Sequence, residues 1–182
     1  MNRGRKPRSW WPTDTDGCPV ETLSEDQAKR LRERASNLCI WHLAQGPRTR
    51  AQLREAMVKH AVPGDMADEV LADMERYGYV NDAAYAEGLV RSRTVHGLKA
   101  RRAIGYELAR KGVDREVAAT ALAEVSDETE AENAVALARK KARTVQGLPE
   151  QKQIQRIVGM LARRGYGSSV AYAAAREAVQ GP

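Results

Sequence analysis

The stretch ELARKGVDREVAATAL, at residues 107–122, predicts the fold because its pattern occurs in two other parts of the chain. The corresponding stretches are AMVKHAVPGDMADEVL at residues 56–71 and MLARRGYGSSVAYAAA at residues 160–175. Each places apolar residues at helical spacing on both sides of a short turn. The offsets of 51 and 53 residues indicate one structural unit repeated three times along the chain.

Start and stop signals divide each unit into three helices. Two helix starts match the capping-box pattern, Ser24 with Gln27 and Thr49 with Gln52. A Gly-Pro pair at residues 46–47 ends the helix between them. These signals predict helices at about residues 25–45 and 50–60, with a third helix after them. The apolar stripe of the first helix is expected to consist of Leu31, Ala35, Leu38 and Trp41.

Strand signals do not compete with this pattern, because sustained apolar alternation is missing and good helix formers dominate. We predict an all-α fold of three tandem three-helix repeats that form a curved, elongated array. The predicted repeats cover residues 24–80, 81–126 and 127–182. A unit of about 50 residues buries a marginal core, so contacts between units should stabilise the array. Residues 1–23, basic and rich in Pro, are predicted to be a disordered tail.

The composition narrows the class of protein. Of 182 residues, 42% are hydrophobic and 30% charged, which suits a folded chain. No run of about 18 apolar residues predicts a membrane span, and the basic N-terminus lacks the apolar segment of a secretory signal. The two cysteines, Cys18 and Cys39, give no disulfide framework. We therefore expect a cytoplasmic protein and take it to be a monomer.

Sequence motifs for catalysis or cofactor binding are missing. No phosphate-binding Gly-rich loop is present, and the close pair Gly165 and Gly167 lacks the third glycine of a dinucleotide site. Cys39 and His42 are the one pair at ligand-like helical spacing, and a metal ion needs more ligands. We predict no catalytic, cofactor or metal site, and no enzymatic activity.

The charges are arranged in blocks. Residues 88–115 carry a net charge of +6 and residues 133–164 carry +7, with −6 on residues 116–132 between them. Because the basic blocks fall at equivalent places in two repeats, we predict a positive face for a nucleic-acid backbone or an acidic protein groove. Lys111 and Arg164 also suit the dipole at a helix end without any ligand. The candidate binding residues are Arg91, Arg93, Lys99, Arg101, Arg102, Arg110, Lys111, Arg139, Lys140, Lys141, Arg143, Arg156, Arg163 and Arg164.

A helix-turn-helix arrangement is a second interpretation of residues 49–71. Its third helix would enter the major groove, yet residues 65–76 carry a net charge of −4. Phosphates would repel that helix, so we do not expect it to read bases.

The sequence YGYVNDAAYAEGLVRSRTVHGLKARRAIGYELARKGV, at residues 77–113, resembles the central signature of the bacterial RecX family. MLARRGYG at residues 160–167 is also typical of that family, and the resemblance covers about residues 34–180. It implies a fold of three tandem three-helix repeats. The departures are Leu89, where many members have Phe, Ala103, where Arg is common, and Ala61, in place of the turn glycine of the first repeat.

The resemblance also implies a function, the regulation of the recombinase RecA. Members bind in the helical groove of the RecA filament on single-stranded DNA. There they inhibit its ATPase, strand-exchange and co-protease activities, which modulates DNA recombination, DNA repair and the SOS response. Many members also bind DNA directly, single-stranded or double-stranded. The basic face would then contact RecA or the enclosed DNA.

Several alternatives stay open. The chain could be an autonomous DNA-binding regulator that acts without a filament, or a helical-repeat scaffold for an unrelated acidic protein. On a filament, it could cap an end or coat the groove. The tail with Trp10 and Trp11 could be an arm that stacks on bases or an unstructured leader.

Overall fold

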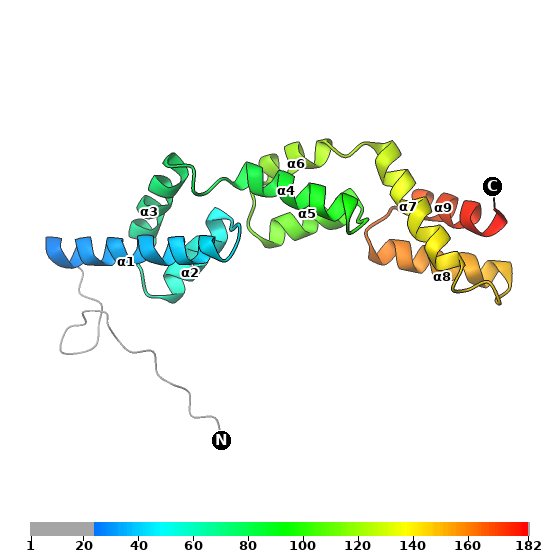
Figure 1. Ribbon diagram of the computed structural model, residues 1–182, viewed down its shortest axis with the longest axis horizontal. Coiled ribbons are helices and arrows are strands. Elements are labelled where there is room, and N and C mark those ends of the chain that lie inside the picture. The colour runs from blue at the N-terminus through cyan, green and yellow to red at the C-terminus, as the bar shows by residue number, and fades with distance from the viewer. Residues whose placement is uncertain (1–23, 182) are drawn as a thin grey trace, which may run out of the picture. The chain divides into compact units, whose positions relative to one another are not determined.

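The computed structural model describes residues 24–181, which form nine α-helices and no β-strand within that range (Figure 1). The predicted all-α fold is confirmed, whereas the tail at residues 1–23, with Trp10 and Trp11, lies outside the described residues. The helices are α1 (Glu25–Ala44), α2 (Arg50–Lys59), α3 (Gly64–Arg76), α4 (Asp82–Val95), α5 (Arg101–Arg110), α6 (Arg115–Ala123), α7 (Asp127–Ala142), α8 (Glu150–Arg163) and α9 (Ser168–Gln180).

The described residues form two compact units. The first unit holds α1, α3 and the part of α2 from residue 53 onward. The second unit holds residues 48–52, which include the first turn of α2, and the chain from residue 80 onward. We call α4–α6 the second repeat and α7–α9 the third repeat.

Side-chain caps determine where α1 and α2 begin. The Ser24 hydroxyl accepts a hydrogen bond from the backbone N–H of Gln27 at 3.3 Å, and the Gln27 side chain accepts one from the backbone N–H of Ser24 at 3.0 Å. Thr49 and Gln52 make the same two bonds, each at 3.2 Å. Both predicted capping boxes are confirmed, and each satisfies amide groups that a helix start leaves without partners.

In the first unit, α1 packs against α3 and buries Leu31, Ala35 and Cys39. These three residues are four positions apart, so they lie on one face of the helix. Trp41 is 59% exposed, and the prediction that it belongs to the apolar stripe is wrong. Trp41 follows Cys39 by two residues, which turns it about 200° around the helix axis.

The second and third repeats each enclose a core of their own. Ile104 and Leu108 of α5 are fully buried in the core of the second repeat, and Ile157 and Leu161 of α8 are fully buried in the core of the third. Ala100, in the loop before α5, is also fully buried, and it packs into the core of the third repeat. The loop therefore joins the two repeats through shared apolar packing.

Candidate binding surface of the basic residues

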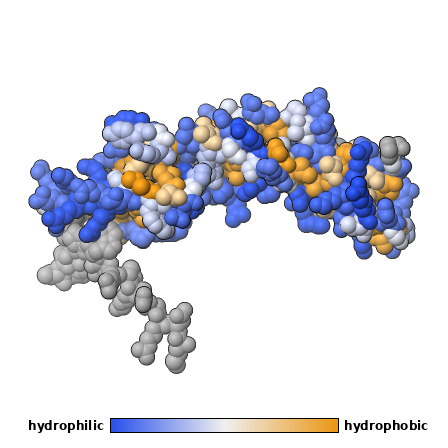
Figure 2. Space-filling model, viewed as in Figure 1, coloured by the Kyte–Doolittle hydropathy of each residue, from blue (hydrophilic) through white to orange (hydrophobic). Residues whose placement is uncertain are grey.

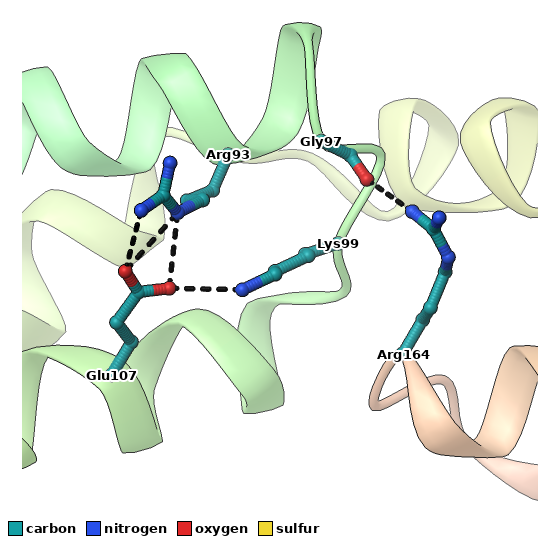
Figure 3. A network of polar contacts seen from close by, with 5 residues as sticks. All are labelled: Arg93, Gly97, Lys99, Glu107 and Arg164. Carbon is teal, nitrogen blue, oxygen red and sulfur yellow. Dashed lines mark hydrogen bonds and ion pairs between the residues drawn. The ribbon is translucent and has the colours of Figure 1, made fainter.

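The carboxylate of Glu107 on α5 holds two of the predicted binding residues. Figure 3 shows Arg93 of α4 and Lys99 of the α4–α5 loop converging on this carboxylate. Arg93 donates through Nη2 at 2.7 Å and through Nε at 3.0 Å, and Lys99 Nζ donates at 3.0 Å. The hydrogen bonds from Arg93, together with the weaker effect of the one from Lys99, lower the pKa of Glu107 to about 2 against the cost of burial. The two cations are thus already paired within the protein.

Three further predicted cations also have partners inside the chain. Arg101 forms ion pairs with Asp127 and Glu130 at the start of α7, the second with an N···O distance of 2.6 Å. The Arg139 guanidinium lies 2.9 Å from the Glu177 carboxylate on α9. Arg164 donates to the backbone carbonyl of Gly97 (Figure 3). In total, five of the fourteen predicted residues make side-chain hydrogen bonds or ion pairs within the described part of the chain, and these support the fold.

The contacts of Arg164 belong to a junction between the second and third repeats. The Ala100 backbone N–H donates to the carbonyl of Arg164 at 3.2 Å, and the Tyr166 hydroxyl donates to the carbonyl of Leu98 at 3.0 Å. Burial raises the pKa of Tyr166 to about 12, so this hydroxyl keeps its proton. The end of α8 thereby lies against the loop that starts α5. The junction places basic side chains of both repeats on one body.

Nine of the predicted residues have no carboxylate partner in the part of the chain that the structure describes. Lys111 and Lys141 are half-buried and the others are exposed. Figure 2 shows hydrophilic residues over much of the visible face. The exposed Lys152 is not among the predicted residues, although it lies four residues before Arg156 on α8. The nine residues are Arg91, Arg102, Arg110, Lys111, Lys140, Lys141, Arg143, Arg156 and Arg163.

An exposed aromatic ring lies among these cations and was also missed. Tyr106 of α5 is 62% exposed, and the Arg102 guanidinium lies 5.8 Å from the centroid of its ring. The spacing could have revealed it, because Arg102, Tyr106 and Arg110 are four residues apart and share one face of α5.

The described residues offer no group of three or more His, Cys, Asp or Glu side chains that could hold a metal ion. Cys39 is buried with its Sγ 3.7 Å from Sδ of Met57, and burial raises the pKa of its thiol to about 11. A thiol that keeps its proton is a poor metal ligand. Among residues 24–181, no helix is long and apolar enough to cross a membrane.

The fold and this surface define a class, an all-helical repeat protein with exposed basic residues on successive repeats. Models of the RecX second and third three-helix domains match residues 81–122 and 128–175. The chain is 39% identical to regulatory protein RecX of Streptomyces coelicolor over 172 residues, 93% of this chain and 92% of that protein. It is 42% identical to that of Mycolicibacterium smegmatis over 161 residues, 85% and 86% of the two chains. The chain belongs to the RecX family of regulatory proteins.

Solved structures agree in fold. RecX from Lactobacillus salivarius superposes with a TM-score of 0.76 and 23% identity, over 82% of this chain and 97% of the other. A second RecX crystal structure gives a TM-score of 0.73 at 24% identity, over 89% and 81%.

Proposed function

We propose that the protein binds the RecA filament on single-stranded DNA in the cytoplasm and inhibits its ATPase, strand-exchange and co-protease activities. It would thereby modulate recombination, DNA repair and the SOS response. Membership of the RecX family supports a regulatory role. The observation that carries the proposal is the set of nine cations on the second and third repeats that have no carboxylate partner among the described residues, which suits a polyanionic groove.

The proposed mechanism is a clamp on neighbouring RecA protomers. A filament changes between nucleotide-dependent states as it hydrolyses ATP and exchanges strands. A protein that binds one state more tightly shifts the equilibrium by its differential affinity. Two basic repeats held together by the junction at Ala100 and Arg164 would contact adjacent protomers as one body.

The ion pairs decide which residues a charge-reversal test should change. Reversal of Arg93 or Arg139 would remove a partner of Glu107 or Glu177 and disturb the fold. The test therefore replaces by Glu four exposed cations that have no carboxylate partner among residues 24–181. Its control exchanges Arg and Lys at the same positions, which keeps the charge. The four positions are Arg91, Lys140, Arg156 and Arg163.

The readout is the ATPase rate of RecA on single-stranded DNA, titrated with each variant at near-physiological salt. The unmodified protein and the charge-keeping control should inhibit, and the charge-reversed variant should not. Full inhibition by a folded charge-reversed variant would contradict the proposal. Inhibition far below the RecA concentration would favour end capping or long-range locking, and inhibition near saturation would favour groove coating.

The exposed ring of Tyr106 beside Arg102 favours a second candidate, a regulator that binds DNA without RecA. Its affinity should fall with salt, with a log–log slope of about −0.9 per phosphate on duplex and about −0.7 on single strands. Normal DNA binding without any effect on RecA would support this candidate.

A further inference from the structure

One face of α5 carries an aromatic ring between two cations. Arg102, Tyr106 and Arg110 are successive neighbours at a spacing of four residues, so the two cations lie about 12 Å apart along the helix axis. Tyr106 is 62% exposed although the Arg102 guanidinium lies 5.8 Å from the centroid of its ring, which leaves room for a further planar group. Tyr106 and Arg110 also line a surface depression of about 520 Å³ together with Lys99 and Lys111.

The charges next to this ring remain available for a ligand. The one carboxylate that lines the depression, Glu107, already accepts hydrogen bonds from Arg93 and Lys99. Arg102 and Arg110 have no carboxylate partner among residues 24–181. The aromatic ring between two cations is not a feature that all three repeats share, because the residues at the position of Tyr106 in the other two repeats are Glu55 and Gly159.

An exposed ring flanked by arginines fits one ligand best. Single-stranded nucleic acid presents unpaired base faces that stack on aromatic rings, and phosphates that pair with the flanking cations. A duplex hides its base faces within its own stack. An acidic polypeptide would pair with the arginines but would leave the ring without a role.

We propose that Tyr106 is a base-stacking residue for single-stranded nucleic acid, with Arg102 and Arg110 on the flanking phosphates. The proposal rests on the proposed function and deepens it, because it names the ligand of one part of the same basic surface. The surface selects single strands over duplex through the ring, and it binds phosphate through the two arginines.

The test measures binding of the full chain to two labelled strands of equal length by fluorescence anisotropy, without RecA. One strand is oligothymidylate, and the other is an abasic strand that keeps the phosphates and lacks the bases. Tyr106→Ala should weaken binding to oligothymidylate about tenfold and leave binding to the abasic strand unchanged, since stacking is lost and charge is kept. Tyr106→Phe should bind as the unmodified protein does.

Two further variants complete the set. Arg110→Gln should weaken binding to both strands and reduce the salt slope by about 0.7, because one phosphate contact is lost. Tyr172→Ala is the matched control, since Tyr172 is a 48% exposed tyrosine of α9 outside this surface, and it should bind both strands normally.

Three results would overturn the inference. They are normal oligothymidylate binding by Tyr106→Ala, equal losses of this variant on both strands, and binding of the unmodified protein to a labelled duplex of the same length that is as tight as its binding to oligothymidylate or tighter. Binding of polyglutamate as tight as that of oligothymidylate would instead assign the surface to an acidic protein. The ATPase titration tests the filament proposal separately. If the unmodified protein binds DNA through Tyr106 but does not inhibit RecA, only the filament proposal is overturned.

Discussion

The turn that follows α2 and the turns that follow α5 and α8 have the same backbone geometry but different residues. Ala61, Gly112 and Gly165 adopt left-handed φ values of 58°, 75° and 93°. Each donates its N–H to the carbonyl three residues earlier, and the residue after it donates to the carbonyl five residues before itself. This is the hydrogen-bond pattern of a Schellman helix end. Backbone conformation alone therefore does not explain why two of the three residues are glycines.

The difference lies in what the turns touch. A Cβ added to Gly112 would lie 2.3 Å from Cβ of Ala51, and one added to Gly165 would lie 2.6 Å from Cβ of Ala103. Both pairs belong to the second unit, where the turn packs against the first residues of α2 or α5. Ala61, in contrast, is exposed. Glycine is required where the backbone approaches another helix closely, and alanine is tolerated where it does not.

Gly165→Ala should have the largest effect on stability. The new Cβ would also lie 2.8 Å from the backbone N of Ala103, and that atom cannot move away without shifting α5. The left-handed backbone adds about 1–2 kcal/mol for a non-glycine residue, and overpacking adds a similar amount. We expect a loss of about 3 kcal/mol or more in the free energy of unfolding, measured by urea denaturation.

Gly167→Ala is the matched control for this substitution. Gly167 precedes α9 with φ −65°, and a Cβ added there would meet no atom within 4 Å. It should change the unfolding free energy by less than about 1 kcal/mol. Equal losses at positions 165 and 167 would show that close packing at the junction is not the cause.

Gly112→Ala should have a smaller effect that can be rescued. The contact of the added Cβ below 3 Å is with the side chain of Ala51 alone, so we expect a loss of about 2–3 kcal/mol. Adding Ala51→Gly should recover the steric part, less a helix-propensity cost of about 1 kcal/mol. A double-mutant cycle would measure the coupling. Independent losses at the two positions would contradict the packing argument.

The sequence was sufficient to predict the helices because their signals are local. Capping residues such as Thr49, the apolar spacing of Ile104 and Leu108, and the glycine turns all act within a few residues. The prediction that Trp41 belongs to the apolar stripe of α1 was wrong, because a residue two positions beyond the buried Cys39 lies on another face of the same helix.

The candidate site was less predictable because partners of its cations lie far away in the chain. Arg101 and Glu130 are 29 residues apart, and Arg139 and Glu177 are 38 apart. Helix packing brings these side chains together, and no sequence motif predicts such an ion pair. The ring of Tyr106 between two arginines, in contrast, is a local pattern that the sequence already contains.

Glu107→Gln tests whether ion pairs support the loop that the third repeat packs against. Glu107 holds Lys99, which precedes the junction residue Ala100. The lowered pKa corresponds to about 3 kcal/mol in full, which solvent screening of these partly exposed side chains reduces to roughly 1–2 kcal/mol. We expect a loss of that size at pH 7, measured by urea denaturation.

The pH dependence of this loss identifies its cause. Because the folded-state pKa of about 2 lies below the ordinary 4.5, the contribution of Glu107 is present above about pH 4.5. It disappears as the pH falls from about 4.5 to about 2. The difference in stability between the unmodified protein and Glu107→Gln should therefore shrink over this range. A difference that does not change with pH would point to packing rather than charge.

Ala61→Gly should have the smallest effect, and the opposite sign. Ala61 is exposed and adopts φ 58°, a conformation that glycine reaches without steric cost. Glycine also increases the entropy of the unfolded chain, which offsets part of the gain. We expect a net stabilisation of about 0.5–1 kcal/mol in urea denaturation. Destabilisation would mean that the methyl group of Ala61 makes a contact in the folded protein, and the first turn would then be constrained by packing as the two glycine turns are.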